Sequence, residues 1–296
     1  MTFYKFTKAP SKRIKALFGL EPNVLGELLL TALPVLTENR RKEQEFRLSR
    51  KRAVGGGRKR SLKPFQEILI TLAYLRHNVS HEVLGELFGV SADVSENTFH
   101  EVIPVLREVC PSRRWDAEKR WNKSAPSWEP EDIDKTIVDT FETPVRRPSL
   151  NERQKRLYSG KKRRHTLKTQ VITDKDGEIL EVEAGHRGPK GDIKLYEESK
   201  VSEEYPEAEG MGDLAYKSEK HPEISTPHKK PKGGKLTPEQ KEENRKFSQK
   251  RVKVEHSIRR LKGWRILRED YRLAIGLFPL IAATVTGLVQ LSRIFV

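Results

Sequence analysis

Three acidic residues in this sequence have the chemistry and the contexts that reactions on phosphate groups require. Asp139 and Asp213 each lie within or just after a short apolar run of strand type, and Glu255 lies on a long helical pattern. Carboxylates brought together from strand ends and a helix form a hard, oxygen-rich site. Such a site suits Mg²⁺, which keeps waters and is completed by substrate phosphates. The three acids therefore predict a metal-dependent site for a phosphate-containing substrate.

The chain around these acids is strongly basic. It has 58 Lys and Arg against 42 Asp and Glu among 296 residues, which gives a net charge of +16 and a pI of about 9.8. This charge favours a polyanionic partner, because neutralising phosphates supplies much of the affinity for a nucleic acid. A soluble basic protein with no such partner has the same composition. An acidic pocket inside a basic protein indicates an enzyme that cuts or joins DNA or RNA.

The cysteine content favours a reducing compartment, and the apolar segments favour a protein without a membrane anchor. The single cysteine, Cys110, excludes disulfides within the chain and a zinc site of the CxxC type, and it follows a helical pattern typical of a core residue. The N-terminal region has no apolar h-region, so we expect no signal peptide. Residues 273–292 carry no charge and are long enough to span a bilayer. Gly, Pro, Thr and Gln dilute this segment, which favours a buried helix over a membrane anchor.

The elements that must position the three acids follow an α/β order. Two strand-type runs flank the Asp176-Gly177 turn, which predicts a hairpin. Thr237 followed by a proline predicts the start of a helix that continues past Glu255. The expected order is strand, strand, strand, helix, strand, helix, over residues 135–141, 158–174, 178–186, 192–200, 208–216 and 237–262.

A helical module precedes this region, over residues 62–110. Ser80 and Ser91 are predicted N-caps of two helices separated by a short turn that contains glycine. This spacing is typical of a helix-turn-helix motif, whose second helix enters the major groove of DNA. We expect the exposed start of that helix to include Ser95 and Asn97, although its residues are not strongly basic. An ordinary three-helix packing unit has the same spacing.

The chain is expected to divide into four segments. The three glycines at 55–57 predict a basic hinge. Trp115, Trp121 and Trp128 lie in a charged, proline-containing linker, where they either anchor the linker onto a domain or stack on bases; we favour the anchor. The expected segments are an N-terminal helical region with the hinge (1–57), a helix-turn-helix DNA-binding domain (58–110), the linker (111–134) and a catalytic domain (135–296).

Several motifs together resemble those of a known family. The stretches VDTFETPVRRP, QKRLYSGKKRRHTLKTQVITD, GDLAY and RVKVEHSIRRLKGWRIL are similar to the catalytic core of DDE transposases, in particular the IS5-type group of bacterial insertion-sequence transposases. The stretch LGELFGVS resembles the family's helix-turn-helix. The whole resemblance covers roughly residues 62–290. It implies an α/β ribonuclease H-like catalytic domain, a mixed sheet flanked by helices, preceded by an all-α helix-turn-helix domain.

The resemblance assigns the three acids as the catalytic residues and metal ligands. It implies that Asp139, Asp213 and Glu255 hold two Mg²⁺ ions per active site, with Mn²⁺ able to substitute. Such ions activate water and then a 3′-hydroxyl, and they stabilise the leaving oxygen. A transposon 3′ end is thereby freed and then joined to target DNA, with no covalent enzyme nucleophile.

Basic residues beside these acids are expected to contact DNA. The family has Tyr, Arg, Glu and Lys at fixed spacing around the glutamate, and Arg251 and Lys262 match while Ser248 stands at the tyrosine position. At about 100° per residue, Arg251, Glu255 and Lys262 lie within roughly 40° on one helix face. Part of the run Lys161, Lys162, Arg163 and Arg164 is open to a second interpretation, a solvated charge run. The expected DNA contacts are Lys161, Lys162, Arg163, Arg164, Arg251, Lys262, Ser95 and Asn97.

Asp192, in GPKGDIK, occupies an acidic position that recurs in the family. We interpret it first as a helix cap and second as a rival metal ligand.

The resemblance implies a DNA transposase that binds terminal inverted repeats and catalyses metal-dependent cleavage and strand transfer. Its partners would be double-stranded DNA, at transposon ends and target, and at least one further copy of the chain. We expect it in the bacterial cytoplasm at the nucleoid and not in a membrane. Two alternatives remain: a catalytically silent descendant that only binds DNA, and a related nuclease without strand transfer.

Overall fold

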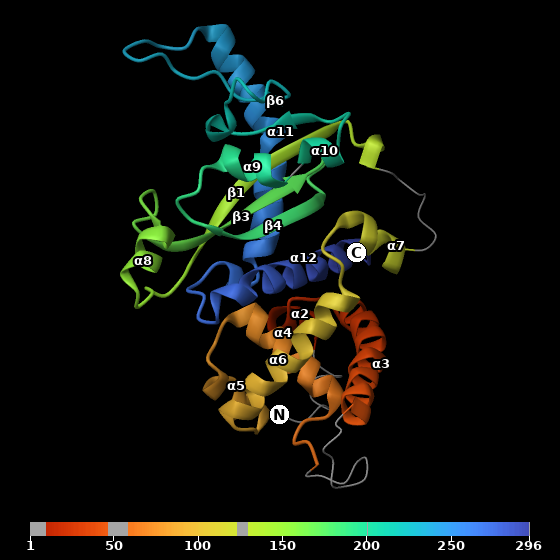
Figure 1. The fold of residues 1–296 in the computed structure, drawn as a ribbon. Helices are drawn as coiled ribbons and strands as arrows, with labels where there is room; N and C mark the ends of the chain where they lie inside the picture. The colour runs from red at the N-terminus through yellow and green to blue at the C-terminus, as the bar shows by residue number, and fades with distance from the viewer. Residues whose placement is uncertain (1–9, 47–58, 123–129, 200, 296) are drawn as a thin grey trace.

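The computed structural model describes residues 10–46, 59–122, 130–199 and 201–295. A helical N-terminal part lies beside an α/β part, and the helix α12 (Phe278–Ile294) runs between them (Figure 1). The predicted glycine hinge at 55–57 and Trp128 fall outside the described residues.

The N-terminal part is all-helical. The Ser80 and Ser91 hydroxyls accept hydrogen bonds from the N–H groups of Val83 and Val94, so both predicted N-caps are confirmed. Gly89 lies between the two helices with a φ of 71° and ends the first of them. The helices are α2 (Ser11–Phe18), α3 (Pro22–Phe46), α4 (Pro64–His77), α5 (His81–Phe88), α6 (Ala92–Val109) and α7 (Arg114–Trp121).

Helix α7 lies within the predicted linker and packs against α12 and the sheet. The Trp121 ring meets the edge of Phe295 with 6.1 Å between ring centroids, and this side chain packs against the hydrophobic core. Trp121 therefore anchors this segment onto the protein, as predicted.

The α/β part is built on a mixed sheet in the order β4-β3-β1-β5-β6, with the short β2 also paired to β3. The predicted hairpin is confirmed, since β3 and β4 are antiparallel around the Asp-Gly turn. Strand β1 pairs with β3 antiparallel and with β5 parallel. The strands are β1 (Lys135–Pro144), β2 (Tyr158–Ser159), β3 (Arg164–Thr173), β4 (Ile179–Arg187), β5 (Glu209–Met211) and β6 (Ile224–Ser225).

The prediction of a strand over 208–216 is wrong in its second half. Strand β5 ends at Met211, and the 3₁₀ turn η2 (Leu214–Tyr216) follows. The cause is local, because the Asp213 carboxylate accepts the N–H of Ala215 at 2.8 Å and turns the chain out of the sheet. Elements missing from the sequence prediction, α8 (Asn151–Leu157), α10 (Val201–Glu204) and β6, are short and lie in polar stretches.

Helices cover both faces of the sheet. Helix α9 (Asp192–Ser199) and α10 lie on one face, and α11 (Pro238–Lys262) and α12 pack against the other. The alternation of β1 follows these layers: Val138 belongs to the cluster under α9, while Ile137 and Phe141 belong to the core under α11. This mixed sheet flanked by helices is the arrangement that the ribonuclease H-like resemblance predicted.

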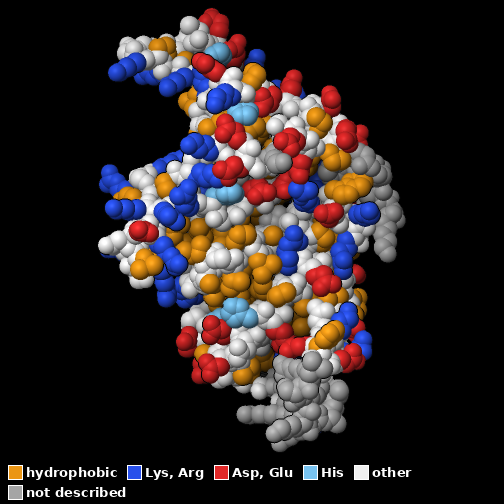
Figure 2. All heavy atoms as spheres, viewed as in Figure 1, with side chains coloured by type: hydrophobic (Ala, Val, Ile, Leu, Met, Phe, Trp, Pro, Cys, Tyr) orange, Lys and Arg blue, Asp and Glu red, His pale blue; other side chains and the backbone are white. Residues whose placement is uncertain are grey.

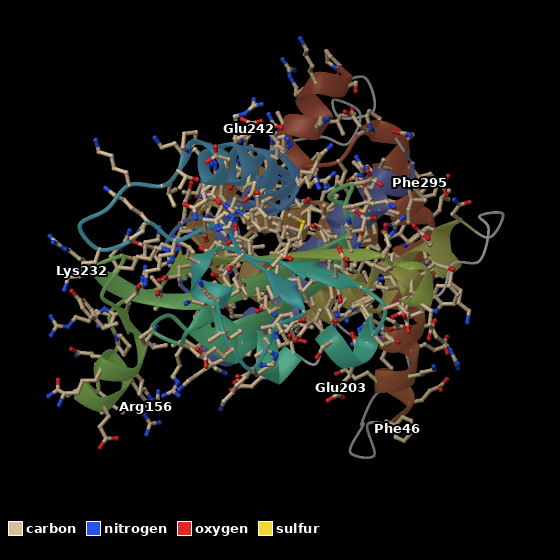
Figure 3. The ribbon with its side chains drawn as sticks, turned by 90° about the horizontal axis from the view of Figure 1, so that it is seen from above. Phe46, Arg156, Glu203, Lys232, Glu242 and Phe295 are labelled. Carbon is tan, nitrogen blue, oxygen red and sulfur yellow. The ribbon has the colours of Figure 1, made fainter. Side chains whose placement is uncertain are left out.

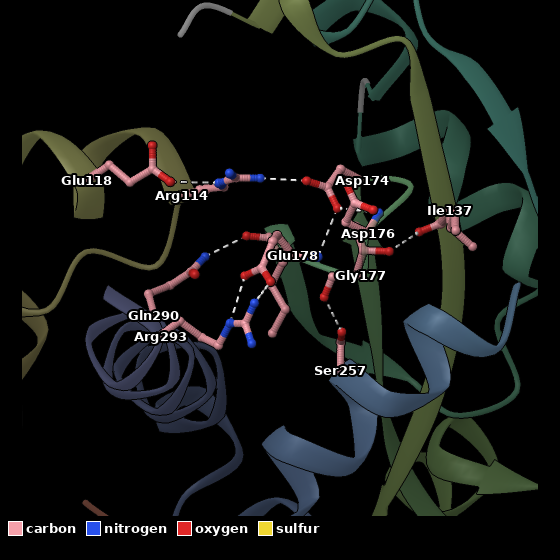
Figure 4. Close-up of polar contacts among 12 residues, drawn as sticks. Arg114, Glu118, Ile137, Asp174, Asp176, Gly177, Glu178, Ser257, Gln290 and Arg293 are labelled. Atoms are coloured by element: carbon pink, nitrogen blue, oxygen red, sulfur yellow. Dashed lines mark hydrogen bonds and ion pairs between the residues drawn. The ribbon is translucent and has the colours of Figure 1, made fainter. Parts of the chain in front are cut away.

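Helix α11 is fixed to the sheet at the turn between β3 and β4. The Ser257 hydroxyl donates to the Gly177 carbonyl at 2.5 Å (Figure 4). The Arg260 guanidinium donates to the same carbonyl, also at 2.5 Å. Gly177 has a φ of +80°, and a Cβ there would lie 3.0 Å from the Lys253 carbonyl oxygen. The glycine of the turn is therefore required both by its conformation and by the close approach of α11.

Helix α12 is a core helix, as predicted. The segment Ile275–Ile294 is long and apolar enough to cross a membrane, but 61% of its apolar window is buried inside the protein. It packs on α6, α7 and β4, and the Gln290 amide donates to the Ile179 carbonyl at 2.5 Å (Figure 4). Its apolar composition is accounted for by contacts with both parts of the chain.

Candidate active site

Asp139 lies in the middle of β1, on the face that α11 covers. The period of two along the strand places it between Ile137 and Phe141, which belong to the core under α11. Its side chain is 19% exposed, and its Oδ1 accepts the backbone N–H of Thr140 at 2.8 Å. A central strand thus holds this carboxylate rigidly at the junction of sheet and helix.

Helix α11 brings Glu255 to Asp139 through Arg251. The Arg251 guanidinium donates from Nη1 to Asp139 Oδ2 at 2.9 Å and from Nη2 to Glu255 Oε1 at 2.6 Å. Helix α11 docks through Val254, Ile258 and other buried residues, which leaves Glu255 46% exposed. The predicted helix face is confirmed in its geometry. Arg251 therefore binds both carboxylates.

Asp213 follows β5, the strand that pairs with β1 on the side away from β3. In the parallel pair β1–β5, Ile137 faces Met211, so Asp139 and Asp213 each lie two residues beyond the last matched pair. The Asp213 charge acts on Asp139 electrostatically. The sheet therefore brings the second acid beside the first, although Asp213 itself lies outside β5.

The three carboxylates do not converge as an assembled metal cage. Among the residues that the structure describes, no three Asp, Glu, His or Cys side chains are placed to hold one ion together. The cation between Asp139 and Glu255 is the Arg251 guanidinium. The donor chemistry nevertheless fits a divalent ion, because all three side chains offer carboxylate oxygens.

An open cavity of about 590 Å³ lies over these residues. Asp139 and Glu255 line it, together with Lys161, Lys162 and Lys262. Lys262 lies over the Phe141 ring, 5.1 Å from its centroid. Three predicted DNA-contacting lysines thus border the same cavity as two predicted metal ligands.

The rest of the predicted basic run lies outside this cavity lining. Arg163 is exposed with a φ of +51°, in the turn between β2 and β3. Arg164 forms an ion pair with Asp270 at 2.5 Å, in which both side chains are about half exposed. The structure therefore separates the run into two lysines at the cavity and two arginines beside it.

Burial changes the titration of two groups at the site. Burial raises the pKa of the Asp139 carboxyl above its ordinary value, and the Arg251 guanidinium opposes this shift. Burial, with the nearby Lys162 charge, lowers the pKa of the Lys262 ammonium. Burial is the largest cause of both pKa shifts.

Asp192 and Lys168 form an ion pair at the floor of the cavity. Lys168 Nζ donates to Asp192 Oδ1 at 2.7 Å, and the Thr140 hydroxyl donates to the same oxygen at 3.1 Å. The two side chains are only 9% and 12% exposed. The interpretation of Asp192 as a helix cap is corrected, because its carboxylate binds these strand residues. Lys168 was missed by the sequence analysis; its signal is a lysine within the strand run TLKTQVIT.

The two predicted DNA contacts on the helix-turn-helix differ in accessibility. Ser95 is 1% exposed, and its hydroxyl contacts His81 Nδ1 at 2.9 Å, so the prediction that it reaches DNA is wrong. The face of α6 that carries Ser95 packs against α5 instead of solvent. Asn97 is exposed and lines a separate cavity of about 560 Å³ with Lys59 and Arg60.

Comparison with known proteins shows the family to which this chain belongs. Residues 138–291 match the family described as DDE superfamily endonuclease, and residues 60–112 match the helix-turn-helix of DDE superfamily endonucleases. The chain belongs to the DDE superfamily of insertion-sequence transposases. The first match spans β1 through α12, and the second covers α4 to α6.

Two curated relatives support the same assignment. Over 237 residues the chain is 32% identical to a probable transposase for insertion sequence element IS702 from Microchaete diplosiphon, covering 78% of this chain and 82% of the relative. Over 219 residues it is 29% identical to a putative transposase for insertion sequence element IS112 from Streptomyces albus G, covering 73% and 76%. DDE superfamily endonucleases generally use divalent metal ions, which agrees with the oxygen donors at this site.

Proposed function

We propose that this DDE superfamily transposase cuts DNA at the terminal inverted repeats of its element and joins the freed 3′ ends to target DNA. The observation that supports this most is that Asp139 and Glu255 line one cavity with Lys161, Lys162 and Lys262, while Asp213 follows the strand that pairs with β1. Carboxylates that can bind a metal ion and lysines that can bind phosphates then lie within reach of one phosphodiester.

Each residue has a proposed part in this reaction. Asp139, Asp213 and Glu255 would hold two divalent ions, Mg²⁺ or Mn²⁺ in its place. When bound, such ions supply the charge that stabilises the attacking and leaving oxygens of an in-line displacement. Lys161, Lys162 and Lys262 would bind the phosphates around the scissile bond, with Arg163, Arg164 and Arg251 as further contacts. No side chain of the enzyme becomes bonded to DNA.

Other parts of the proposal concern the whole protein. We place the helix-turn-helix domain at 58–110, between an N-terminal region (1–57) and a linker (111–134), and the catalytic domain at 135–296. Asn97 remains the proposed contact of the recognition helix with a terminal repeat. Pairing two transposon ends needs at least two copies of the chain on DNA. We place the protein in the bacterial cytoplasm, at the nucleoid.

A cleavage and joining assay tests the reaction. Labelled duplexes that carry the element's own ends are incubated with the protein and a target plasmid, in Mg²⁺, Mn²⁺ or EDTA. We expect nicks at the element boundary and end-to-plasmid products, both lost in EDTA.

The same assay distinguishes the alternatives. Nicks at the boundary without joined products would support a nuclease that does not transfer strands. Tight binding of the ends with no cutting in either metal would support a silent DNA-binding descendant. Cutting that ignores the element boundary would contradict recognition of the terminal repeats.

A further inference from the structure

A basic loop outside the active-site cavity is the strongest feature that the proposed reaction leaves unused. Residues 226–236, here called the lysine loop, connect β6 to the N-terminus of α11. The loop contains Lys229, Lys230, Lys232 and Lys235 and no acidic residue. All four lysines are exposed, and Lys and Arg side chains gather on this protrusion (Figure 2). Four charges of one sign in a loop without acidic residues favour an anionic partner.

The lysine loop is held in a defined position. The backbone N–H of His228 donates to Asn244 Oδ1 at 2.7 Å, and Asn244 Nδ2 donates back to the His228 carbonyl at 3.1 Å. The His228 imidazole also contacts Glu243 at 2.5 Å. Inside the loop, Gly234 N donates to the Pro231 carbonyl at 3.2 Å. Because the loop is already ordered, less conformational entropy is lost when its lysines bind a ligand.

Asn244 places the loop on the same face of α11 as the active site. Asn244 lies eleven residues before Glu255, and at 100° per residue the two side chains differ in direction by only about 20°. Arg251, which binds Asp139, lies on the same face. The loop therefore lies along the strip of α11 that carries the catalytic glutamate, displaced toward the helix N-terminus.

The length of α11 gives the separation. A rise of about 1.5 Å per residue puts Asn244 about 16 Å and Thr237 about 27 Å from Glu255 along the helix axis. At about 3.4 Å per base pair, this corresponds to about 5 to 8 base pairs of a duplex. Lys232 of the loop and Arg156 of α8 project on the same side of the molecule (Figure 3). The loop therefore adds positive charge to a side that already carries basic residues.

We propose that the lysine loop binds the phosphate backbone of the duplex that is being cut, about 5 to 8 base pairs from the scissile phosphate. This inference rests on the proposed function, and it adds a second contact region on the cut DNA. The contact reads no sequence, because lysine bonds to phosphates position a duplex without distinguishing its bases. It would hold the scissile phosphate over the acids while the helix-turn-helix module binds elsewhere.

Binding to duplexes of different length tests this proposal. Two duplexes keep the element boundary fixed and extend 12 base pairs on one side but only 3 on the other, one toward the element and one toward flanking DNA. Affinity is measured in EDTA over a range of salt for the wild type and for Lys230→Gln/Lys232→Gln. We expect the loop variant to bind one duplex about tenfold more weakly, with a salt slope smaller by about 2. The other duplex should be bound equally by both proteins.

A matched control lies on the same helix. Lys246→Gln/Lys250→Gln removes two exposed charges from the opposite side of α11, and we expect it to bind both duplexes like the wild type. Asn244→Ala keeps every lysine but removes the two bonds to His228, and we expect a loss of about threefold on the same duplex only. This result separates a positioned loop from a diffuse charge.

Other outcomes have distinct meanings. If the loop and helix variants weaken binding equally, or if the loss does not depend on which side is long, the lysine loop has no defined phosphate contact and the proposal is wrong. If the wild type binds neither duplex, the proposed function itself fails and this inference fails with it.

Discussion

Lys168 and Asp192 form an ion pair across β1 from Asp139, the first of the proposed metal ligands. Both side chains are nearly buried, and the Thr140 hydroxyl shares the Asp192 oxygen. A buried pair adds little net stability, but removing one partner leaves an uncompensated charge that costs about 3–5 kcal/mol. The pair therefore fixes the side of β1 opposite to α11, which in turn fixes the strand that carries Asp139.

Lys168→Met should lower the free energy of unfolding by about 3 kcal/mol, as measured by urea denaturation at pH 7. Lys168→Met/Asp192→Asn should recover most of this loss, because no charge is left unpaired. As a control, Lys175→Met removes an exposed pair with Asp134, in which both side chains are more than half exposed, and should cost less than about 1 kcal/mol. Equal losses for Lys168→Met and the control would contradict the buried pair.

A buried carboxylate on β4 makes the stability of the folded protein depend on pH. Glu181 on β4 pairs with Arg113 at 2.9 Å, and Arg113 also binds Glu204 on α10 at 2.6 Å. Burial, followed by the neighbouring Glu204 carboxylate, raises the pKa of Glu181 from 4.5 to about 7 although Arg113 opposes the shift. The folded protein therefore holds a proton at this site that the unfolded chain releases near pH 4.5.

The consequence is a loss of stability as the pH rises from about 4.5 to 7, since the native state binds the extra proton only in that window. Glu181→Gln should abolish this contribution. Relative to the wild type, the variant should gain about 1–3 kcal/mol between pH 4.5 and pH 7.5 in urea denaturation. Parallel stability curves for the two proteins across that window would show that Glu181 titrates normally.

Elements with strong local signals could be predicted from the sequence. Ser80, Ser91 and Thr237 cap helices through their own side chains, and an Asp-Gly turn needs only its own residues, so these features were found where expected. Ser95 was misplaced because the face of α6 that packs inward depends on α5, which the periodicity of a single helix does not reveal.

In the candidate site, too, local features could be predicted from the sequence and tertiary contacts could not. The three acids were proposed from their local motifs, and in the structure Arg251 binds both Asp139 and Glu255. The role of Arg251 as the cation between them depends on how α11 docks on β1, which is a tertiary contact. Lys168 and its pairing with Asp192 likewise join segments 24 residues apart.

Helix α12 packs on both parts of the molecule, and it contacts the helical part at the C-terminal end of α6. Gly287 on α12 lies so close to this end that an added Cβ would be 2.0 Å from the carbonyl oxygen of Cys110, the residue after α6. The other side of α12 packs on β4 of the sheet. One helix therefore joins the helix-turn-helix part to the α/β part through a backbone contact that only glycine allows.

Gly287→Ala should destabilise the protein by about 3 kcal/mol, through overpacking, although alanine ordinarily favours a helix by about 1 kcal/mol over glycine. The measurement is the change in the free energy of unfolding by urea. Gly276→Ala is the matched control, because an added Cβ there meets no atom within 4 Å. A variant at 287 that is as stable as the control would mean that α12 and α6 are not in backbone contact.

We propose that Asp139, Asp213 and Glu255, which come from β1, from the chain after β5 and from α11, hold the metal ions with which this protein cuts DNA. The most direct test is single-turnover cleavage of a duplex with the element's ends by Glu255→Gln in Mg²⁺, with binding to the same duplex measured in parallel. The control is Glu242→Gln, which changes a carboxylate of the same helix that pairs with Arg245 and points away from Glu255.

We predict that Glu255→Gln lowers the cleavage rate by about a thousandfold or more while the affinity for DNA changes by less than about threefold, because the proposed metal ligand loses its charge at nearly constant volume. Glu242→Gln should cut and bind like the wild type. Cleavage by Glu255→Gln at the wild-type rate would contradict the assignment of this site.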